Sequence, residues 1–524
     1  MVSESDRPNK LREIAAARSQ LRDILFYTQP DSFYEMIWSA DKLSQGEESS
    51  QICFSDYPKD FVAAQPGSQY YIAEWMLENL VNEYFLCNSG WVTKGLLPVK
   101  SVDHSKWSSF VGIHNLSRKV SDKQTFIDYE PTSILESMPR LARNQFEWQR
   151  GFTNAAYISR NLFLYSDEEF FTYFYEIHQV RLDDFILCLF AVFSQATSSP
   201  HVRYKPIIDF LPTGRDSTRR ALDLVSQEQR MLHRKAAATY GEESLFDHRR
   251  SFLRDYPAIR LGVDHLVVPI PRLLVRRMTS GLYYDFVKRD SLKRKMGIAF
   301  ERYVELLLNA SFDYANVFRE TKFSRGPQGD TADFMVISRV RDAALIVECK
   351  ARRVPLRVSV AASPSRAKEA YTDIAKGIYQ VWKSARRWVA GEVDGWGRVP
   401  RDMLGIVITL EPWAEIGDSE YKVALAGAHK EWQRNFPGIS PPDIPVVPID
   451  IQTAEDIIFR RDFAGVAKFV IQSWKNFHQR PWVDPRYPED LVLRNEDPFY
   501  LPLSENTLWK EVFNRGDLFN SATP

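Results

Sequence analysis

The sequence predicts a multi-domain protein, with an α-rich N-terminal region followed by a C-terminal α/β domain in which helices flank a mixed central sheet. Three observations lead to this prediction. The chain has 524 residues, which is too many for one compact core. Residues 1–200 carry mainly helical patterns. After Asp264, short apolar runs are interleaved with amphipathic stretches, the pattern of a sheet with helices on both faces.

The helical N-terminal domain is expected over residues 1–200. Ser166 and Glu169 have the spacing of a capping box, which predicts the start of a helix. Leu182 to Ala196 is apolar on nearly every side, as in a helix at the centre of a bundle. We expect this domain to sense a trigger, bind a partner or recognise the substrate, with a purely structural role as the alternative. It contains no phosphate loop, nucleophile elbow or HExxH motif.

Residues 201–285 are predicted to form a charged helical connector. Pro200 to Pro212 is a break, and a highly charged helical stretch follows from about Asp216 to Arg254. Its basic residues are typical of a solvated helix face, with phosphate contact as the alternative. His265 to Pro271 is expected to be extended, and Arg272 to Val287 has helical spacing.

The remaining chain is predicted to form a domain over 286–480 and a tail over 481–524. Apolar residues at helical spacing predict an amphipathic helix from Lys293 to Leu308. The elements expected after it are strands at about 316–323, 332–338 and 344–350, a helix at about 366–389, strands at 404–410 and 445–451, and a helix near 461–476.

Charged side chains gather where two of these strands meet. Asp333 opens one strand, and Glu348 and Lys350 close the next. Alternate residues of a strand point the same way, so Glu348 and Lys350 share a face. They are either a salt bridge at a sheet edge or part of a metal site. Charged groups in a close set at the end of an apolar strand are costly unless they are used, which favours the metal site.

The order of these residues carries a family resemblance. A helix with Glu301, a strand with Asp333, a strand ending in Glu348-Cys349-Lys350 and a helix with Gln380 together resemble the PD-(D/E)XK nuclease superfamily of restriction-endonuclease-like and Mrr-like enzymes. The resemblance covers about residues 285–475. The family usually has a Pro-Asp pair, and this chain has Ala332-Asp333.

Two further patterns are similar to the nuclease domains of bacterial anti-phage defence proteins. They are Gly297-x-x-Phe300-Glu301-x-Tyr303 and Asp373-x-x-Lys376-x-x-x-Gln380. The resemblance implies a C-terminal domain with the restriction-endonuclease-like fold and hydrolysis of nucleic acid with Mg²⁺, for which Mn²⁺ can substitute.

The resemblance also implies a role for each residue. Mg²⁺ prefers oxygen ligands and lowers the pKa of bound water. The implied ligands are the carboxylates of Asp333 and Glu348, the backbone carbonyl of Cys349, and Glu301, directly or through water. Lys350 would hold or deprotonate the attacking water and offset negative charge. Gln380 would orient the site, with a solvated helix residue as the alternative.

Net charge is zero, so a nucleic-acid partner must be argued from local charge. Between Arg339 and Arg387 twelve Lys or Arg residues stand against four acids. Basic surfaces of this kind contact phosphates, with a solubilising helix face as the alternative. The candidate nucleic-acid-binding residues are Arg352, Arg353, Arg357, Lys376, Lys383, Arg386 and Arg387.

The amino-acid composition indicates the kind of protein and the compartment in which it is expected. A hydrophobic content of 44% with 13% aromatic residues is that of a folded soluble protein. The four cysteines are scattered without a CxxC pair, which favours a reducing cytoplasm over a disulfide framework or a zinc site. The longest apolar run, Phe185 to Phe193, is too short to span a membrane.

The leading hypothesis is a DNA endonuclease in bacterial anti-phage defence, which acts on double-stranded DNA as a homo-oligomer and has a defence partner or trigger. The alternative is a non-catalytic nucleic-acid-binding or scaffolding protein that keeps a nuclease-like fold. The sequence leaves open DNA against RNA, endonuclease against exonuclease, and the size of the assembly.

Overall fold

The structure is a computed structural model of the whole chain. It describes residues 7–47, 49–87, 102–128, 145, 147–211, 213–240, 251–262, 264–312, 317–325, 329–338, 343–351, 371–410, 418–460 and 462–475. The predicted tail over 481–524 lies outside these residues. No helix among the described residues is long and apolar enough to cross a membrane.

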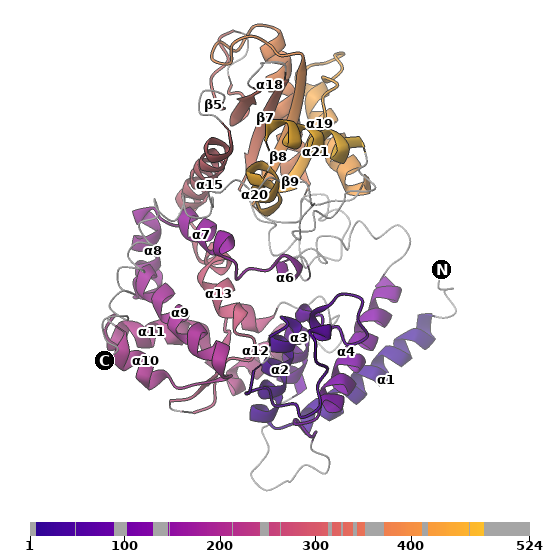
Figure 1. The fold of residues 1–524 in the computed structure, drawn as a ribbon, viewed down its shortest axis with the longest axis vertical. Coiled ribbons are helices and arrows are strands. Elements are labelled where there is room, and N and C mark those ends of the chain that lie inside the picture. Colours follow the sequence, from indigo (N-terminus) through magenta and orange to yellow (C-terminus); the bar gives the residue numbers. More distant parts are fainter. Residues whose placement is uncertain are drawn as a thin grey trace.

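The N-terminal region is helix-rich, as predicted (Figure 1). Its first elements are α1 (Arg7–Phe26), α2 (Pro30–Ser44), η1 (Val62–Ala64), α3 (Glu74–Cys87) and α4 (Trp107–Asp128). After these come α6 (Glu147–Arg150), α7 (Ala155–Leu164), α8 (Glu168–His178) and α9 (Leu182–Ser198). Helix α9 is buried at most of its positions, as its uniformly apolar sequence predicts.

The capping-box prediction at Ser166 is wrong by one residue. The N-cap of α8 is Asp167, whose side chain accepts a hydrogen bond from the Glu169 amide at 2.9 Å. The Ser166 hydroxyl instead donates to the Phe163 carbonyl at the end of the preceding helix. Serine and aspartate are both favourable N-cap residues, but the Ser166 hydroxyl is already hydrogen-bonded to the end of α7.

Residues 201–285 are more than a helical connector. They contain α10 (Tyr204–Phe210), α11 (Arg215–Val225), α12 (Gln229–Thr239), η4 (Phe252–Arg254), α13 (Arg272–Met278), η5 (Ser280–Leu282) and α14 (Tyr283–Phe286). They also contain a small sheet in the order β1-β4-β3-β2, made of β1 (His201–Val202), β2 (Ser226–Glu228), β3 (Ala258–Arg260) and β4 (Leu266–Val267). These strands have two or three residues each, too few to show an alternating pattern in the sequence.

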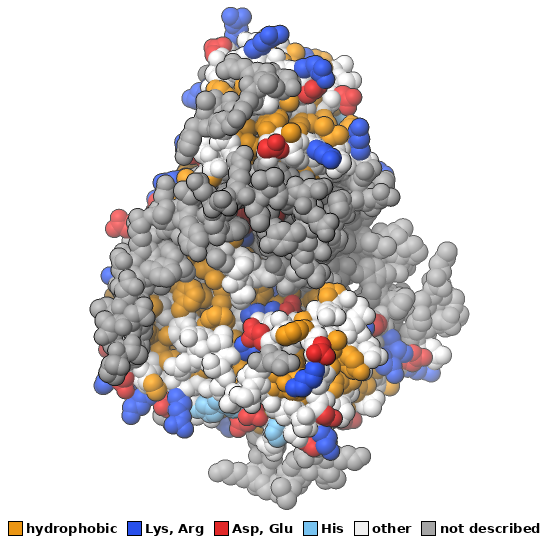
Figure 2. All heavy atoms as spheres, viewed as in Figure 1, with side chains coloured by type: hydrophobic (Ala, Val, Ile, Leu, Met, Phe, Trp, Pro, Cys, Tyr) orange, Lys and Arg blue, Asp and Glu red, His pale blue; other side chains and the backbone are white. Residues whose placement is uncertain are grey.

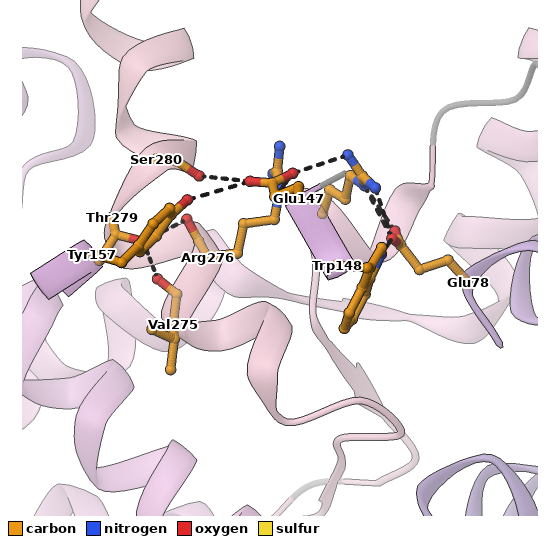
Figure 3. Close-up of polar contacts among 9 residues, drawn as sticks. Glu78, Glu147, Trp148, Tyr157, Val275, Arg276, Thr279 and Ser280 are labelled. Carbon is orange, nitrogen blue, oxygen red and sulfur yellow. Dashed lines mark hydrogen bonds and ion pairs between the residues drawn. The ribbon is translucent and has the colours of Figure 1, made fainter. Parts of the chain in front are cut away.

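A buried ionic network joins several elements of the N-terminal region (Figure 3). Glu78 of α3 accepts hydrogen bonds from Trp148 Nε1 (2.6 Å) and from Arg254 Nη2 (2.8 Å). Glu147 of α6 accepts one from Arg276 Nε of α13 at 2.9 Å. Buried Glu78 and partly exposed Glu147 therefore meet two buried guanidinium groups, and this pairing is the condition under which buried charges are tolerated.

The C-terminal region has the expected α/β order (Figure 1). Its elements are α15 (Asp290–Ser311), β5 (Val317–Arg319), β6 (Phe334–Ile337), β7 (Ala343–Lys350), α18 (Thr372–Val389), β8 (Asp402–Thr409), α19 (Asp418–Asn435), β9 (Val446–Asp450), α20 (Ile451–Arg460) and α21 (Phe463–Lys475). The single helix expected near 461–476 is thus preceded by a second helix, α20.

The sheet is mixed, as predicted, in the order β5-β6-β7-β8-β9. Strands β5, β6 and β7 are antiparallel neighbours, whereas β7, β8 and β9 run parallel. Helices cover both faces. Leu345 and Val347 belong to one core cluster with α15, α20 and α21, and Ala344 and Ile346 belong to another with α18 and α19.

The core does not break at the predicted domain boundaries. One cluster of buried side chains runs from Leu162 to Val470 and includes Ala196 and Val202 around position 200. It also continues through Phe286 and Leu292 around position 286. The buried core thus gives no boundary at these two positions, and the division into domains stays a prediction.

A buried polar contact also ties the two regions together. Arg160 of α7 forms an ion pair with Glu455 of α20, and the Tyr303 hydroxyl of α15 donates to the same carboxylate at 2.7 Å. The Arg160 and Glu455 side chains are only 4% and 3% exposed.

Candidate active site

Asp333, Glu348 and Lys350 meet at the ends of β6 and β7. Phe334 of β6 faces Val347 of β7, so the next position along this antiparallel pair sets Asp333 opposite Glu348. The Cys349 amide donates to Asp333 Oδ2 at 2.6 Å, and Lys350 Nζ lies 2.5 Å from Glu348 Oε1. The structure brings the three residues together, and their catalytic roles stay a prediction.

Glu348 is the most deeply buried acid of this group, with 5% of its surface exposed. Burial raises the pKa of Glu348 to about 8, helped by the nearby charge of Asp333 and opposed by Lys350. Its Oε2 is buried and has no hydrogen-bond partner among the described residues. An unpaired buried carboxylate oxygen is costly, so this atom is free to accept a ligand.

Asp333 and Lys350 show the same competition between burial and neighbouring charge. Burial raises the pKa of Asp333, although the Cys349 amide and Lys350 both act to lower it. Burial opposes the charge on Lys350, but the carboxylates of Glu348 and Asp333 outweigh it and raise the pKa of the lysine. Lys350 is therefore a cation in this site.

Glu301 reaches the group from α15. It is half-buried, and burial together with the charges of Asp333 and Glu320 raises its pKa to about 7. The charge of Asp333 thus acts on Glu301, and the role of Glu301 as a metal ligand stays a prediction.

Gln380 holds the backbone that leads into Asp333. Its Nε2 donates to the carbonyls of Asp330 and Thr331, both at 2.9 Å. Ser384, one turn further along α18, accepts a hydrogen bond from the Ala332 amide at 2.7 Å. Gln380 is therefore bound to the backbone that leads into Asp333, and its role in orienting the site stays a prediction.

Glu320 is an acid at this site that sequence reasoning did not select. Its amide donates to the Asp333 carbonyl at 2.7 Å, directly after β5. Burial raises the pKa of Glu320, and Asp333 and Asp330 raise it further. Glu320 follows a strand of only three residues, which leaves too little pattern in the sequence to mark it as a site residue. Glu305 is a nearby acid that the sequence does not distinguish from Glu320, and it is ion-paired with Arg319.

The structure describes four of the seven predicted basic residues, and these four differ in exposure. Arg352, Arg353 and Arg357 lie outside the described residues. Lys376 is exposed, and Lys383 and Arg386 are half-buried. On the face shown in Figure 2, Lys and Arg side chains of the C-terminal region are interspersed with Asp and Glu.

Arg387 faces inward. It is 6% exposed, forms an ion pair with Glu392, donates to the Arg325 carbonyl and lies 3.9 Å from the centre of the Phe323 ring. These contacts hold the loop after β5 and leave this side chain little surface for a phosphate.

The donor set suits a hard divalent cation. Burial raises the pKa values of the acids Glu301, Glu320, Asp333 and Glu348, and neighbouring acids raise those of Glu301, Glu320 and Glu348 further. Carboxylate oxygens are the ligands that Mg²⁺ prefers. Among the described residues, however, no three His, Cys, Asp or Glu side chains form a ready-made set of metal ligands.

Comparison with known proteins adds no relative. No family model, no curated protein and no solved structure matches this chain. The fold and the site define a class of site, in which carboxylates gather at the ends of two interior strands with lysines beside them.

Proposed function

We propose that this protein is a metal-dependent nuclease of the PD-(D/E)XK type, and specifically a DNA endonuclease that serves in bacterial anti-phage defence. One observation carries the proposal. Asp333 and Glu348 stand opposite each other at the ends of two strands, and Lys350 is in contact with Glu348. Two carboxylates and an ammonium group, grouped in a largely buried position, are what phosphodiester hydrolysis with Mg²⁺ needs.

The residues divide the work as follows. Asp333 and Glu348 would hold the ion, with the Cys349 carbonyl between them and Glu301 close enough to act through water. When bound, Mg²⁺ would supply a water of lowered pKa and stabilise charge on the phosphate. Lys350 has a raised pKa, which supports a role in offsetting negative charge rather than in taking a proton.

The proposal includes a setting. Double-stranded DNA is the substrate, and a homo-oligomer would place one centre on each strand. The helix-rich N-terminal region would respond to a defence partner or trigger, and the cytoplasm is the expected compartment.

Plasmid cleavage with Mg²⁺ tests the residues. Asp333→Asn, Glu348→Gln and Lys350→Met are each expected to lower the cleavage rate by about 10²-fold or more. Glu305→Gln is the control, because it removes a carboxylate on α15 that is already ion-paired with Arg319. Full activity in the first three variants would refute the assignment.

A non-catalytic nucleic-acid-binding protein is the second candidate, and one observation favours it. The Glu348–Lys350 ion pair and the Cys349–Asp333 hydrogen bond satisfy part of the site without a metal. This candidate predicts DNA binding that is unaffected by a chelator and no cleavage with any divalent ion.

A further inference from the structure

The face of α18 that touches the start of β6 carries a lysine. Gln380 and Ser384 on this face are hydrogen-bonded to backbone at positions 330–332. Lys383 is three residues after Gln380, so it projects from the same side of the helix. The helix is seated firmly there, because a Cβ on Gly377 would lie only 2.6 Å from Val407 Cγ1 of β8.

Aromatic and glycine residues surround the Lys383 ammonium group. Its Nζ lies 5.3 Å from the centre of the Phe323 ring and 6.0 Å from that of Tyr379. Gly329 lies beside it, since a Cβ at that position would be in ordinary contact with Nζ at 3.8 Å. Within the described part of the chain, no carboxylate forms an ion pair with this ammonium group.

The charges that act on Lys383 are those of the candidate active site. Burial lowers the pKa of Lys383, with Glu348 acting to raise it and Arg387 to lower it further. Asp330 and Glu320 are the other acids that act on it. Lys350 is held by Glu348 at 2.5 Å and Arg387 by Glu392, whereas Lys383 forms no ion pair with an acid among the described residues.

We propose that Lys383 is a second lysine of the active site, which contacts a non-bridging oxygen of the scissile phosphate. The inference rests on the proposed nuclease function. In the reaction a water oxygen forms a bond to phosphorus, one ester P–O bond breaks, and the departing oxygen receives a proton. Lys383 takes no proton in this step, because its role is to offset the charge that develops on the phosphate.

Single-turnover cleavage of plasmid DNA, compared with DNA binding, separates this role from general attraction of DNA. Lys383→Met is expected to lower the cleavage rate by about 10²-fold, with affinity for a short duplex in Ca²⁺ changed by about threefold or less. Lys430→Met removes the same charge from an exposed position on α19, and its cleavage rate should stay near that of wild type. Lys383→Arg keeps the charge and should recover part of the rate.

Mn²⁺ binding measured by calorimetry is a readout that does not depend on cleavage. Loss of the positive charge on which Glu348 acts should strengthen Mn²⁺ binding by about fivefold in Lys383→Met, and Lys430→Met should leave it unchanged. Equal cleavage and equal Mn²⁺ binding in the two methionine variants would overturn the proposal for Lys383. If wild type does not cleave, the nuclease proposal fails, and the Mn²⁺ comparison still decides whether Lys383 faces the acids.

Discussion

The close contact of α18 with the sheet can be tested by one methyl group. In Gly377→Ala the new Cβ would lie 2.6 Å from Cγ1 and 3.0 Å from Cγ2 of Val407. Val407 is fully buried in the middle of the sheet. Rotating its side chain cannot remove both contacts, so the helix has to move.

The net effect combines two opposing contributions. Alanine in place of glycine stabilises a helix by about 1 kcal/mol, and overpacking a dense core costs about 1–3 kcal/mol. We expect Gly377→Ala to lower the free energy of unfolding by up to about 2 kcal/mol. A shift of α18 also moves Gln380 and Lys383, so cleavage should fall as well.

Gly297→Ala is the matched control. Gly297 is inside α15, and a Cβ there would meet nothing within 4 Å. This variant should therefore gain up to about 1 kcal/mol. Hydrogen exchange read separately over α18 and α15 measures both effects. Protection of α18 that is equal or higher in Gly377→Ala, with unchanged cleavage, would refute the reasoning.

Three other predictions concern the N-terminal region and its junction with the sheet. Burial lowers the pKa of His114 to about 4 against about 6.5 in the unfolded chain, so stability should fall by about 3 kcal/mol as the pH drops from about 6.5 to about 4. In urea titrations at several pH values, the free energy of unfolding of His114→Leu should fall less steeply toward acid pH than that of wild type. The same pH dependence in both proteins contradicts the prediction. Arg160→Met leaves the buried Glu455 carboxylate without its cation and should lower the free energy of unfolding by about 3–5 kcal/mol. Part of this loss should be recovered when Glu455 is also changed to Met. An Arg160→Met variant as stable as wild type in urea rules this out. Asp167→Ala should cost about 1 kcal/mol through loss of the α8 cap, and Ser166→Ala should cost less, so the reverse order in thermal unfolding would restore the sequence-based capping box.

Much of the C-terminal fold could be predicted from local sequence. Strands β6, β7, β8 and β9 are apolar runs of four to eight residues, long enough to be recognised. The two-residue alternation of a strand placed Glu348 and Lys350 on one face without reference to any other part of the chain.

Other features depend on partners that are distant in the sequence. Strands of two or three residues around positions 201–267 have no pattern to read, because they are defined by pairing alone. Glu320 follows such a strand, and only its pairing with the residues before β6 brings it to the site.

The sequence by itself determined the order of the chemistry, namely an acid before one strand and Glu-x-Lys at the end of the next. The tertiary structure decided what the α18 residues do. It turned Gln380 toward backbone, buried Arg387 and placed the Lys383 ammonium group beside the Phe323 ring and Gly329. The physical reason is that helical periodicity shows which residues share a side, whereas the packing of α18 on β8 decides what that side faces.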